Sequence, residues 1–366
     1  MFSDFDTQMM QTALTLANEG RFSTSPNPRV GCIITRGTQI VGQGFHIRAG
    51  LPHAEVYALE QAGELARGAT VYVTLEPCSH HGRTPPCAAA LIAAGVSRVV
   101  AAMEDPNPLV AGRGLQMLRE AGIEVQSGLL EHEARALNRG FLSRIERGRP
   151  FVRIKSATSL DGKTALSDGR SQWISDEAAR ADVQKLRAES CAVLTGIGTV
   201  LADNPRLNVR AFDTLRQPAR VVLDTHLQIP EHSNLLADTS APLMIATLSE
   251  NEGRLKTLAE RPHVKILRPS ARNGRIDLAD LLRLLADEGI GEVLVEAGAV
   301  LAGAFLAEGL ADEIVLYQAP KILGGSARSL FALPENPAVL TAEPEWHTHR
   351  VETLGNGIKW TLRKQN

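Results

Sequence analysis

Four side chains in the first quarter of the chain have types and a spacing suited to zinc chemistry. One residue, Ala54, separates His53 from Glu55, and Cys78 and Cys87 each follow a proline. One imidazole and two thiolates leave a fourth zinc position for water, which distinguishes a catalytic site from a closed structural one. Zinc lowers the pKa of bound water to roughly 7, so hydroxide can attack a ring carbon that bears an amino group. Glu55 is then placed to move a proton to a ring nitrogen and to the departing ammonia.

Two other interpretations of these residues stay open. Cys78 and Cys87 could form a disulfide or be two unrelated buried thiols. A zinc ion could also be purely structural if His80 or His81 supplied a fourth ligand. Each part of the pattern is weak by itself, but the combination of His-x-Glu with two Pro-Cys pairs favours a zinc-dependent deaminase.

The elements that must position these residues alternate short apolar strands with helices. We expect strands over residues 30–34, 39–44, 69–75, 96–102 and 124–126, and helices from 54 to about 65, over 87–94 and over 115–121. His53 then lies where a helix begins, Cys78 follows a strand and Cys87 opens a helix. Helix N-termini favour negative charge and therefore help to hold sulfur as thiolate. The alternation predicts a layered α/β/α sandwich.

The second half of the chain begins after a charged segment, residues 144–150, which we interpret as a linker between domains 1–146 and 150–366. Strands are expected over 151–157, 192–195, 220–224, 243–247, 265–267, 292–296 and 313–317, with a helix over 176–188 and helices between most of the others. This pattern predicts a doubly wound sheet, which binds ligands at the carboxyl ends of its strands. Gly196, Gly198 and Gly298 follow strands, and Gly298 precedes a helix that could receive a phosphate. These turns lack the Gly-x-Gly-x-x-Gly fingerprint and are weak signals alone.

Composition excludes several classes of protein. The 366 residues are 44% hydrophobic and 22% charged, with a net charge of -2. This balance gives no general attraction to nucleic acid or to an anionic membrane, and 4% aromatic residues argue against a nucleic-acid editor. We find no run of 18 apolar residues, no signal peptide and too few cysteines for a disulfide scaffold. We therefore expect a cytoplasmic protein with reduced thiols.

The motif around the cysteines resembles one particular family. His53-Ala54-Glu55 with Pro77-Cys78 resembles the cytidine deaminase superfamily, which usually spaces its cysteines as Cys-x-x-Cys. Here eight residues separate them, and segment 76–87 resembles the bifunctional riboflavin-biosynthesis enzymes, which combine a diaminohydroxyphosphoribosylaminopyrimidine deaminase with a 5-amino-6-(5-phosphoribosylamino)uracil reductase. Segments 25–31, 44–46 and 104–108 match the deaminase half. Segments 155–163, 171–175, 195–205 and 295–298 resemble the reductase half, whose fold is similar to dihydrofolate reductase.

The resemblance implies two reactions and a set of contacts. The first is zinc-dependent hydrolytic deamination of 2,5-diamino-6-(5-phosphoribosylamino)pyrimidin-4(3H)-one. The second is NADPH-dependent reduction of the ribosyl chain of the deaminated product to a ribityl chain. The implied pyrimidine and substrate-mouth residues are Asn27, His46, His80, Arg83 and Asn107. Those implied at the ribose phosphate are Lys155, Ser171, Arg187, Leu207, Arg210 and Glu296. Those implied at NADPH are Ala157, Trp173, Thr199, Asp203, Thr225, Gly298, Ala299, Val300 and Leu301.

Further expectations concern partners and alternatives. The family suggests a homodimer or a higher homo-oligomer through the reductase domain, with strands near residues 312–318 pairing between subunits. Lys155 or Asp203 is our hypothesis for the proton transfers of the reduction. A free-nucleoside deaminase would not need a second domain of this size. A non-enzymatic, zinc-stapled binding module would have a fully ligated metal without an open water position.

Overall fold

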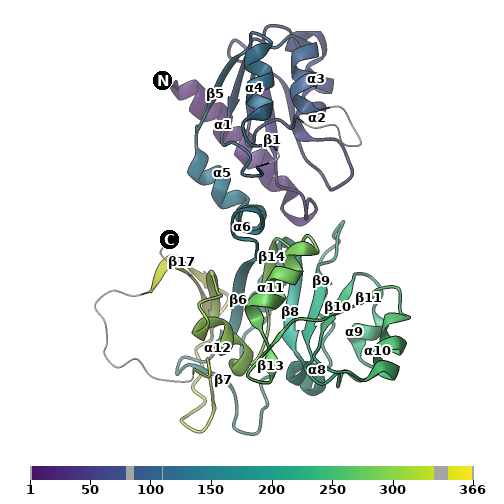
Figure 1. The fold of residues 1–366 in the computed structure, drawn as a ribbon. Helices are drawn as coiled ribbons and strands as arrows, with labels where there is room; N and C mark the ends of the chain where they lie inside the picture. Colours follow the sequence, from purple (N-terminus) through teal and green to yellow (C-terminus); the bar gives the residue numbers. More distant parts are fainter. Residues whose placement is uncertain (1, 80–85, 109, 334–344, 365–366) are drawn as a thin grey trace. The chain divides into compact units, whose positions relative to one another are not determined.

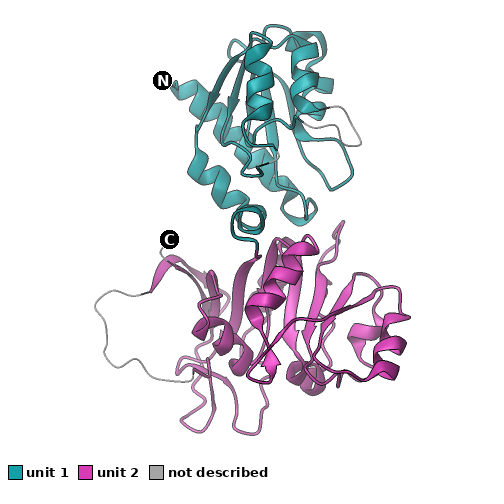
Figure 2. Ribbon diagram, in the orientation of Figure 1, with its two compact units in different colours: residues 1–148 teal, residues 149–366 magenta. Residues whose placement is uncertain are grey.

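The computed structural model describes residues 2–79, 86–108, 110–333 and 345–364 of the chain. It divides into two compact units, Met1–Gly148 and Arg149–Asn366 (Figure 2). The expected linker, residues 144–150, is wrong in its first part, because residues 144–147 form the last turn of helix α6 (Arg139–Arg147). Their charges suggested a loop, but they belong to a helix that buries Leu142 and exposes Glu146 and Arg147. No helix in the described ranges is long and apolar enough to cross a membrane.

Unit 1 is built on a five-stranded sheet in the order β2-β1-β3-β4-β5 (Figure 1). Its strands are β1 (Gly31–Arg36), β2 (Gln39–Phe45), β3 (Thr70–Val73), β4 (Arg98–Ala101) and β5 (Glu124–Ser127). β1 is antiparallel to β2 and β3, and β3, β4 and β5 are parallel. Its helices are α1 (Asp4–Ala17), α2 (Ala54–Ala62), α3 (Cys87–Ala94), α4 (Arg113–Glu120), α5 (Glu131–Leu137) and α6, with 3-10 turns at Asn18–Phe22 and Gly63–Ala66.

The sheet of unit 1 has an apolar core on each face. Residues of α2, α3 and α4 pack on one face, and residues of α1, α5 and α6 pack on the other. This arrangement confirms the predicted α/β/α sandwich. Two glycines of β2 let α2 approach closely, since a Cβ on Gly42 would lie 2.1 Å from the carbonyl oxygen of Ala58. A Cβ on Gly44 would lie 2.5 Å from that of Ala54. This close approach fixes the first turn of α2, where His53-Ala54-Glu55 lies.

Unit 2 is built on a nine-stranded sheet in the order β11-β10-β9-β8-β14-β6-β15-β18-β17. Its strands are β6 (Phe151–Thr158), β8 (Ala192–Gly196), β9 (Ala219–Leu223), β10 (Leu243–Ala246), β11 (Val264–Leu267), β14 (Glu292–Val295), β15 (Glu313–Gln318), β17 (Trp346–Leu354) and β18 (Gly357–Lys364). The short strands β7 (Lys163–Ala165), β12 (Ala271–Arg272), β13 (Arg275–Ile276) and β16 (Arg328–Ser329) form two small separate ladders. Strand β18 runs antiparallel to its two neighbours, β15 and β17, and the other neighbouring strands of the large sheet pair in parallel.

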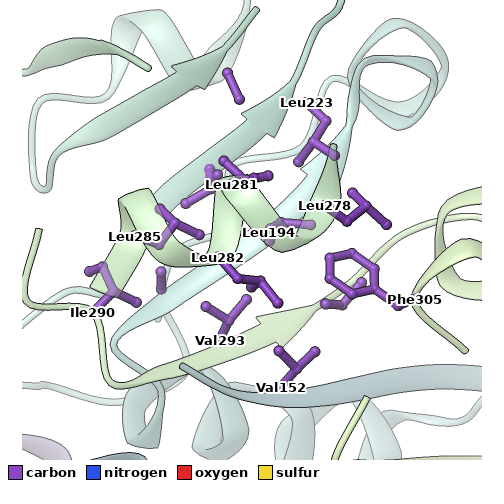
Figure 3. Close-up of a cluster of buried hydrophobic side chains, with 14 of the residues drawn as sticks. Val152, Leu194, Leu223, Leu278, Leu281, Leu282, Leu285, Ile290, Val293 and Phe305 are labelled. Carbon is purple, nitrogen blue, oxygen red and sulfur yellow. The ribbon is translucent and has the colours of Figure 1, made fainter. Parts of the chain in front are cut away.

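Helices cover both faces of this sheet, as the doubly wound prediction requires. They are α7 (Glu177–Glu189), α8 (Ile197–Asp203), α9 (Asn234–Ala237), α10 (Glu252–Ala259), α11 (Leu278–Asp287) and α12 (Ala299–Ala307). Figure 3 shows Leu281, Leu282 and Leu285 of α11 packed over Leu194 and Val293 of the strands. Residues of α7, α9 and α10 form the core on the opposite face.

The expectation that residues 312–318 pair between subunits is wrong for the backbone of this strand. β15 lies between β6 and β18 and is hydrogen-bonded to both. Both of its edges are therefore occupied within one chain, and the outermost strand on this side of the sheet is β17.

Candidate active sites

Three residues of unit 1 form a cluster with the donors that zinc prefers. His53 is the N-cap of α2, Cys78 follows β3, and Cys87 is the first residue of α3. Their ligand atoms all lie within 4.8 Å of one another. His53 Nδ1 is 3.6 Å from Cys78 Sγ and 3.3 Å from Cys87 Sγ. Tetrahedral zinc with ordinary bond lengths would set these separations at about 3.5 Å, so the cluster fits the ion.

The two cysteines are free thiols rather than a disulfide. The hydrogen bond from the Cys87 side chain lowers the pKa of Cys78, and His53 and the Cys87 backbone N–H, 3.3 Å from Cys78 Sγ, act in the same direction. The same contact with Cys78 raises the pKa of Cys87, and the hydrogen bond to Cys78 raises the pKa of His53. Binding of zinc would release the thiol protons, since the metal takes cysteine as thiolate.

Glu55 lies in the first turn of α2, two residues after the ligand His53. Its side chain is buried, with the residue 3% exposed, and Oε2 has no hydrogen-bond partner among the residues that the structure describes. Burial raises the pKa of Glu55 to about 7. A carboxyl group in this state can both accept and release a proton near neutral pH.

Two of the expected substrate residues lie beside the zinc ligands. His46 Nδ1 is 3.0 Å from the carbonyl oxygen of Pro52, which can only accept, so this nitrogen carries the proton. His46 Nε2 therefore accepts from Nδ2 of Asn27 at 3.1 Å. The rings of His46 and His53 meet edge to face with centroids 5.4 Å apart. Burial lowers the pKa of His46, which favours this neutral form.

Of the remaining expected residues of unit 1, the structure describes Asn107. Asn107 follows β4, and its backbone N–H donates to Asp105 Oδ1 at 2.8 Å. His80 and Arg83 lie outside the described residues, as does His81, the other candidate for a fourth ligand. Glu76 was missed as a functional candidate, although it directly precedes the Pro77-Cys78 pair.

In unit 2, charged residues expected at the ribose phosphate converge from β6, α7 and the end of β14. Arg187 donates to both carboxylate oxygens of Glu296, at 2.6 and 2.9 Å, and the side chains are 10% and 11% exposed. Burial lowers the pKa of Lys155, with Glu296 opposing the shift, and burial and Arg187 lower the pKa of Arg210. Three cations thus surround one carboxylate, which leaves a net positive site suited to phosphate.

Three further expected residues of unit 2 have different surroundings. Trp173 is 62% exposed, its ring lies 4.5 Å from the guanidinium of Arg180, and its carbonyl accepts from Lys321 Nζ at 2.7 Å. It lines a cavity of about 360 Å³ at the ends of β15 and β18. The Ser171 carbonyl accepts from the backbone N–H of Ile174, which fixes the turn around Trp173. Leu207 points into the core and is 3% exposed, so only its backbone is available to a ligand.

Apart from Trp173, the residues expected at NADPH share one edge of the sheet, at the carboxyl ends of its parallel strands. They lie in or after the carboxyl ends of β6, β8, β9 and β14, which are adjacent in the order β9-β8-β14-β6. The residues are Ala157 on β6, Thr199 and Asp203 on α8 after β8, Thr225 after β9, and Gly298, Ala299, Val300 and Leu301 after β14. Gly298 is the N-cap of α12, and a Cβ on Gly196 would lie 3.4 Å from Leu301, so the two glycine turns are neighbours. This edge offers a helix N-terminus to a phosphate group.

Two family models match the chain. One describes the zinc-binding region of cytidine and deoxycytidylate deaminases and matches residues 3–103. The other describes the RibD C-terminal domain and matches residues 150–360. The riboflavin biosynthesis protein RibD of Escherichia coli K12 is 49% identical over 341 residues, which cover 90% of this chain and 91% of that protein. RibD of Haemophilus influenzae is 47% identical over 373 residues, covering 98% of each.

Solved structures agree with these similarities. RibD of Acinetobacter baumannii superposes with a TM-score of 0.90 at 45% identity, covering 99% of each chain. A Thermotoga maritima protein described as a diaminohydroxyphosphoribosylaminopyrimidine deaminase/5-amino-6-(5-phosphoribosylamino)uracil reductase superposes with a TM-score of 0.86 at 34% identity, again covering 99% of each chain. The similarity therefore extends over both units in the same order.

Proposed function

Since the chain belongs to the RibD family of bifunctional riboflavin biosynthesis enzymes, we propose that unit 1 performs the deamination and unit 2 the reduction. The substrates are the diaminopyrimidine ribosylamino phosphate and its deaminated uracil product. The observation that carries the proposal is the cluster of His53, Cys78 and Cys87 beside the buried carboxyl of Glu55.

In the deamination, His53, Cys78 and Cys87 would hold zinc, which would lower the pKa of a bound water molecule to about 7. Glu55 accepts a proton from this water, delivers it to a ring nitrogen, and then assists the departure of ammonia. Its buried and unpartnered Oε2 supports this role. Asn27 donates one N–H to His46, which fixes its amide so that Oδ1 is oriented as an acceptor for a pyrimidine N–H.

Asn107, His80 and Arg83 complete the substrate site of unit 1. Asn107 lines its mouth from the loop after β4, and Arg83 binds the phosphate. The assignments of His80 and Arg83 depend on the resemblance of segment 76–87 to the family.

In the reduction, Lys155, Arg187 and Arg210 bind the ribose phosphate, while Glu296 holds Arg187 in place. Ser171 and the backbone at Leu207 contact the same substrate. The ribosylamine opens to an imine, and NADPH would supply the hydride for the imine carbon. The residues that would hold NADPH are Ala157, Thr199, Asp203, Thr225 and residues 298–301 at the carboxyl ends of the strands, together with Trp173. Lys155 or Asp203 assists the proton transfers.

Two assays with one variant test this assignment. The zinc-loaded chain should release ammonia from the diaminopyrimidine with or without NADPH, and should oxidise NADPH only after deamination. Glu55→Gln should abolish ammonia release, retain zinc, and still oxidise NADPH when given the deaminated product. Ammonia release at the wild-type rate from this variant would remove Glu55 from the mechanism. Failure to consume NADPH with the deaminated product would contradict the assignment of unit 2.

We further propose that the chain forms a homodimer or higher homo-oligomer through unit 2. The exposed outermost strand β17, with the exposed apolar residues Val351, Ile358 and Trp360 on the β17–β18 hairpin, supports this proposal. Light scattering of the wild type and of Val351→Lys tests it, since a monomeric wild type would contradict it.

We also place the chain in the cytoplasm, which agrees with its four free cysteines. Fractionation of cells that express it tests this placement.

A further inference from the structure

The carboxylate of Glu76 is buried and accepts four backbone hydrogen bonds. Oε2 accepts from the N–H of Asp105 at 3.1 Å and of Gly112 at 2.9 Å. Oε1 accepts from the N–H of Gly114 at 2.8 Å and of Leu115 at 3.3 Å. One side chain thus satisfies donors on two separate segments, the loop after β4 and the first turn of α4.

Helix α4 depends on this contact because its own N-cap, Gly112, has no side chain to bond the first turn. Glu76 supplies the missing acceptor from a distant part of the chain and places negative charge at the positive end of the helix. The backbones also meet directly, since a Cβ on Gly114 would lie 1.9 Å from the carbonyl oxygen of Pro77. The segment that leads to Cys78 and the start of α4 are therefore packed without a gap.

Cys78 itself is held by contacts that do not involve the Glu76 side chain. The Cys78 carbonyl accepts from the N–H of Ala88 at 3.2 Å, and Cys78 Sγ accepts from the N–H of Cys87 at 3.3 Å. Both contacts come from the start of α3. Loss of the Glu76 carboxylate should therefore leave the zinc ligands in place.

The loop after β4 is held in a different way. Asp105 donates its N–H to Glu76, and Asp105 Oδ1 in turn accepts from the N–H of Asn107 at 2.8 Å. The backbone that carries Asn107 is therefore two hydrogen bonds away from Glu76.

From these contacts we propose that Glu76 is a positioning residue for the deamination, which sets Asn107 at the correct distance from the zinc ligands. The inference rests on the proposed function, because it requires that Asn107 contacts the pyrimidine substrate. Glu76 acts through the loop rather than on the reacting atoms, so it governs substrate affinity and not the affinity for zinc.

The test compares Glu76→Gln with wild-type full-length chain and with Glu104→Gln. Glutamine has the same shape, but its NH₂ group replaces one carboxylate oxygen and faces two backbone N–H donors. The two hydrogen bonds that this oxygen accepted are therefore lost. We expect KM for the diaminopyrimidine to rise about tenfold while kcat changes little, because a loosened positioning loop weakens binding. The zinc dissociation constant, measured by chelator competition, should stay within about twofold. Glu104 is exposed on the same loop, and its carboxylate contacts Ser127, so Glu104→Gln should leave KM unchanged.

A double variant distinguishes the proposed route from a general loosening of unit 1. If Glu76 acts through Asn107, Glu76→Gln combined with Asn107→Ala should have the same KM as Asn107→Ala alone. If the double variant instead shows the product of the two single-variant changes in KM, the inference is overturned. An unchanged KM in Glu76→Gln would also overturn it, as would a loss of zinc affinity that accompanies the change in KM.

Two further results keep the inference separate from the proposed function. Should Glu76→Gln fail to fold, Glu76→Asp keeps the charge but is one methylene shorter, and an unchanged KM in that variant would overturn the inference. If Asn107→Ala alone leaves KM unchanged while the wild type releases ammonia, the deaminase assignment stands and the route through Asn107 is refuted.

Discussion

Replacing Glu296 by glutamine removes the carboxylate that lies among the three cations Lys155, Arg187 and Arg210 of the proposed reductase site. Two charge-assisted hydrogen bonds join Glu296 to Arg187, and glutamine can accept only one of them. Such a bond contributes about 1.5–3 kcal/mol. Breaking a buried ion pair on one side costs about 3–5 kcal/mol. Because one acceptor survives, we expect the free energy of unfolding of unit 2 to fall by about 3 kcal/mol.

The chain offers a selective probe and a matched control for this measurement. Its three tryptophans, Trp173, Trp346 and Trp360, all lie in unit 2, so tryptophan fluorescence during urea unfolding follows that unit alone. Glu288→Gln breaks an ion pair with Lys265 whose side chains are 28% and 52% exposed. An exposed pair contributes little, so this control should change the free energy by less than about 1 kcal/mol.

The positive charge that remains in the site of Glu296→Gln allows a second measurement, the effect of phosphate on stability. Without the carboxylate of Glu296 the three cations repel one another more strongly, so inorganic phosphate should raise the unfolding midpoint of Glu296→Gln more than that of the wild type. If the wild type and Glu296→Gln have the same free energy of unfolding without phosphate, the ion pair between Arg187 and Glu296 does not stabilise unit 2 and the reasoning is refuted.

Other predictions concern unit 1. Removal of zinc by a chelator should abolish ammonia release and leave NADPH oxidation with the deaminated product unchanged, because the two sites lie in separate units. The hydrogen bond from Arg98 holds the pKa of Asp6 well below its usual 3.8. The stability from this pair is therefore present above pH 3.8 and is lost as pH falls through the lowered pKa, so hydrogen exchange in unit 1 of Asp6→Asn and wild type should converge in acid. Gly114→Ala should destabilise unit 1 by about 3 kcal/mol through overpacking against Pro77, measured by hydrogen exchange.

The zinc cluster could be predicted from the sequence because its members lie at the ends of regular elements. His53 begins α2 and Cys87 begins α3, so the hydrophobic pattern that predicts the helices also places the ligands. The same hydrophobic pattern shows strands alternating with helices, and this alternation predicts the layered architecture of both units. Helix α1 is not among the expected elements, although Ser3 and Asp6 form the capping box that typically begins a helix.

Other features depend on contacts between distant residues and have no local signal. Glu76 looks like a polar loop residue in the sequence, and only the fold brings Gly112 and Gly114 to its carboxylate. The interior position of β15 depends on β18, which pairs with it from near the end of the described chain. The resemblance implies that Leu207 contacts the substrate, but the fold turns its side chain into the core.

The late position of β18 in the chain has a consequence for synthesis on the ribosome. The deaminase cluster is complete once residues 1–148 have emerged, whereas β15 keeps an open edge until β18 follows. At about 5–20 residues per second, translation of residues 149–366 takes about 10–45 s. During part of that interval the nascent chain carries a finished zinc-binding unit and a reductase sheet with an unpaired strand edge. An unpaired edge is prone to aggregation, so this stage is the one at which chaperones would protect the growing chain.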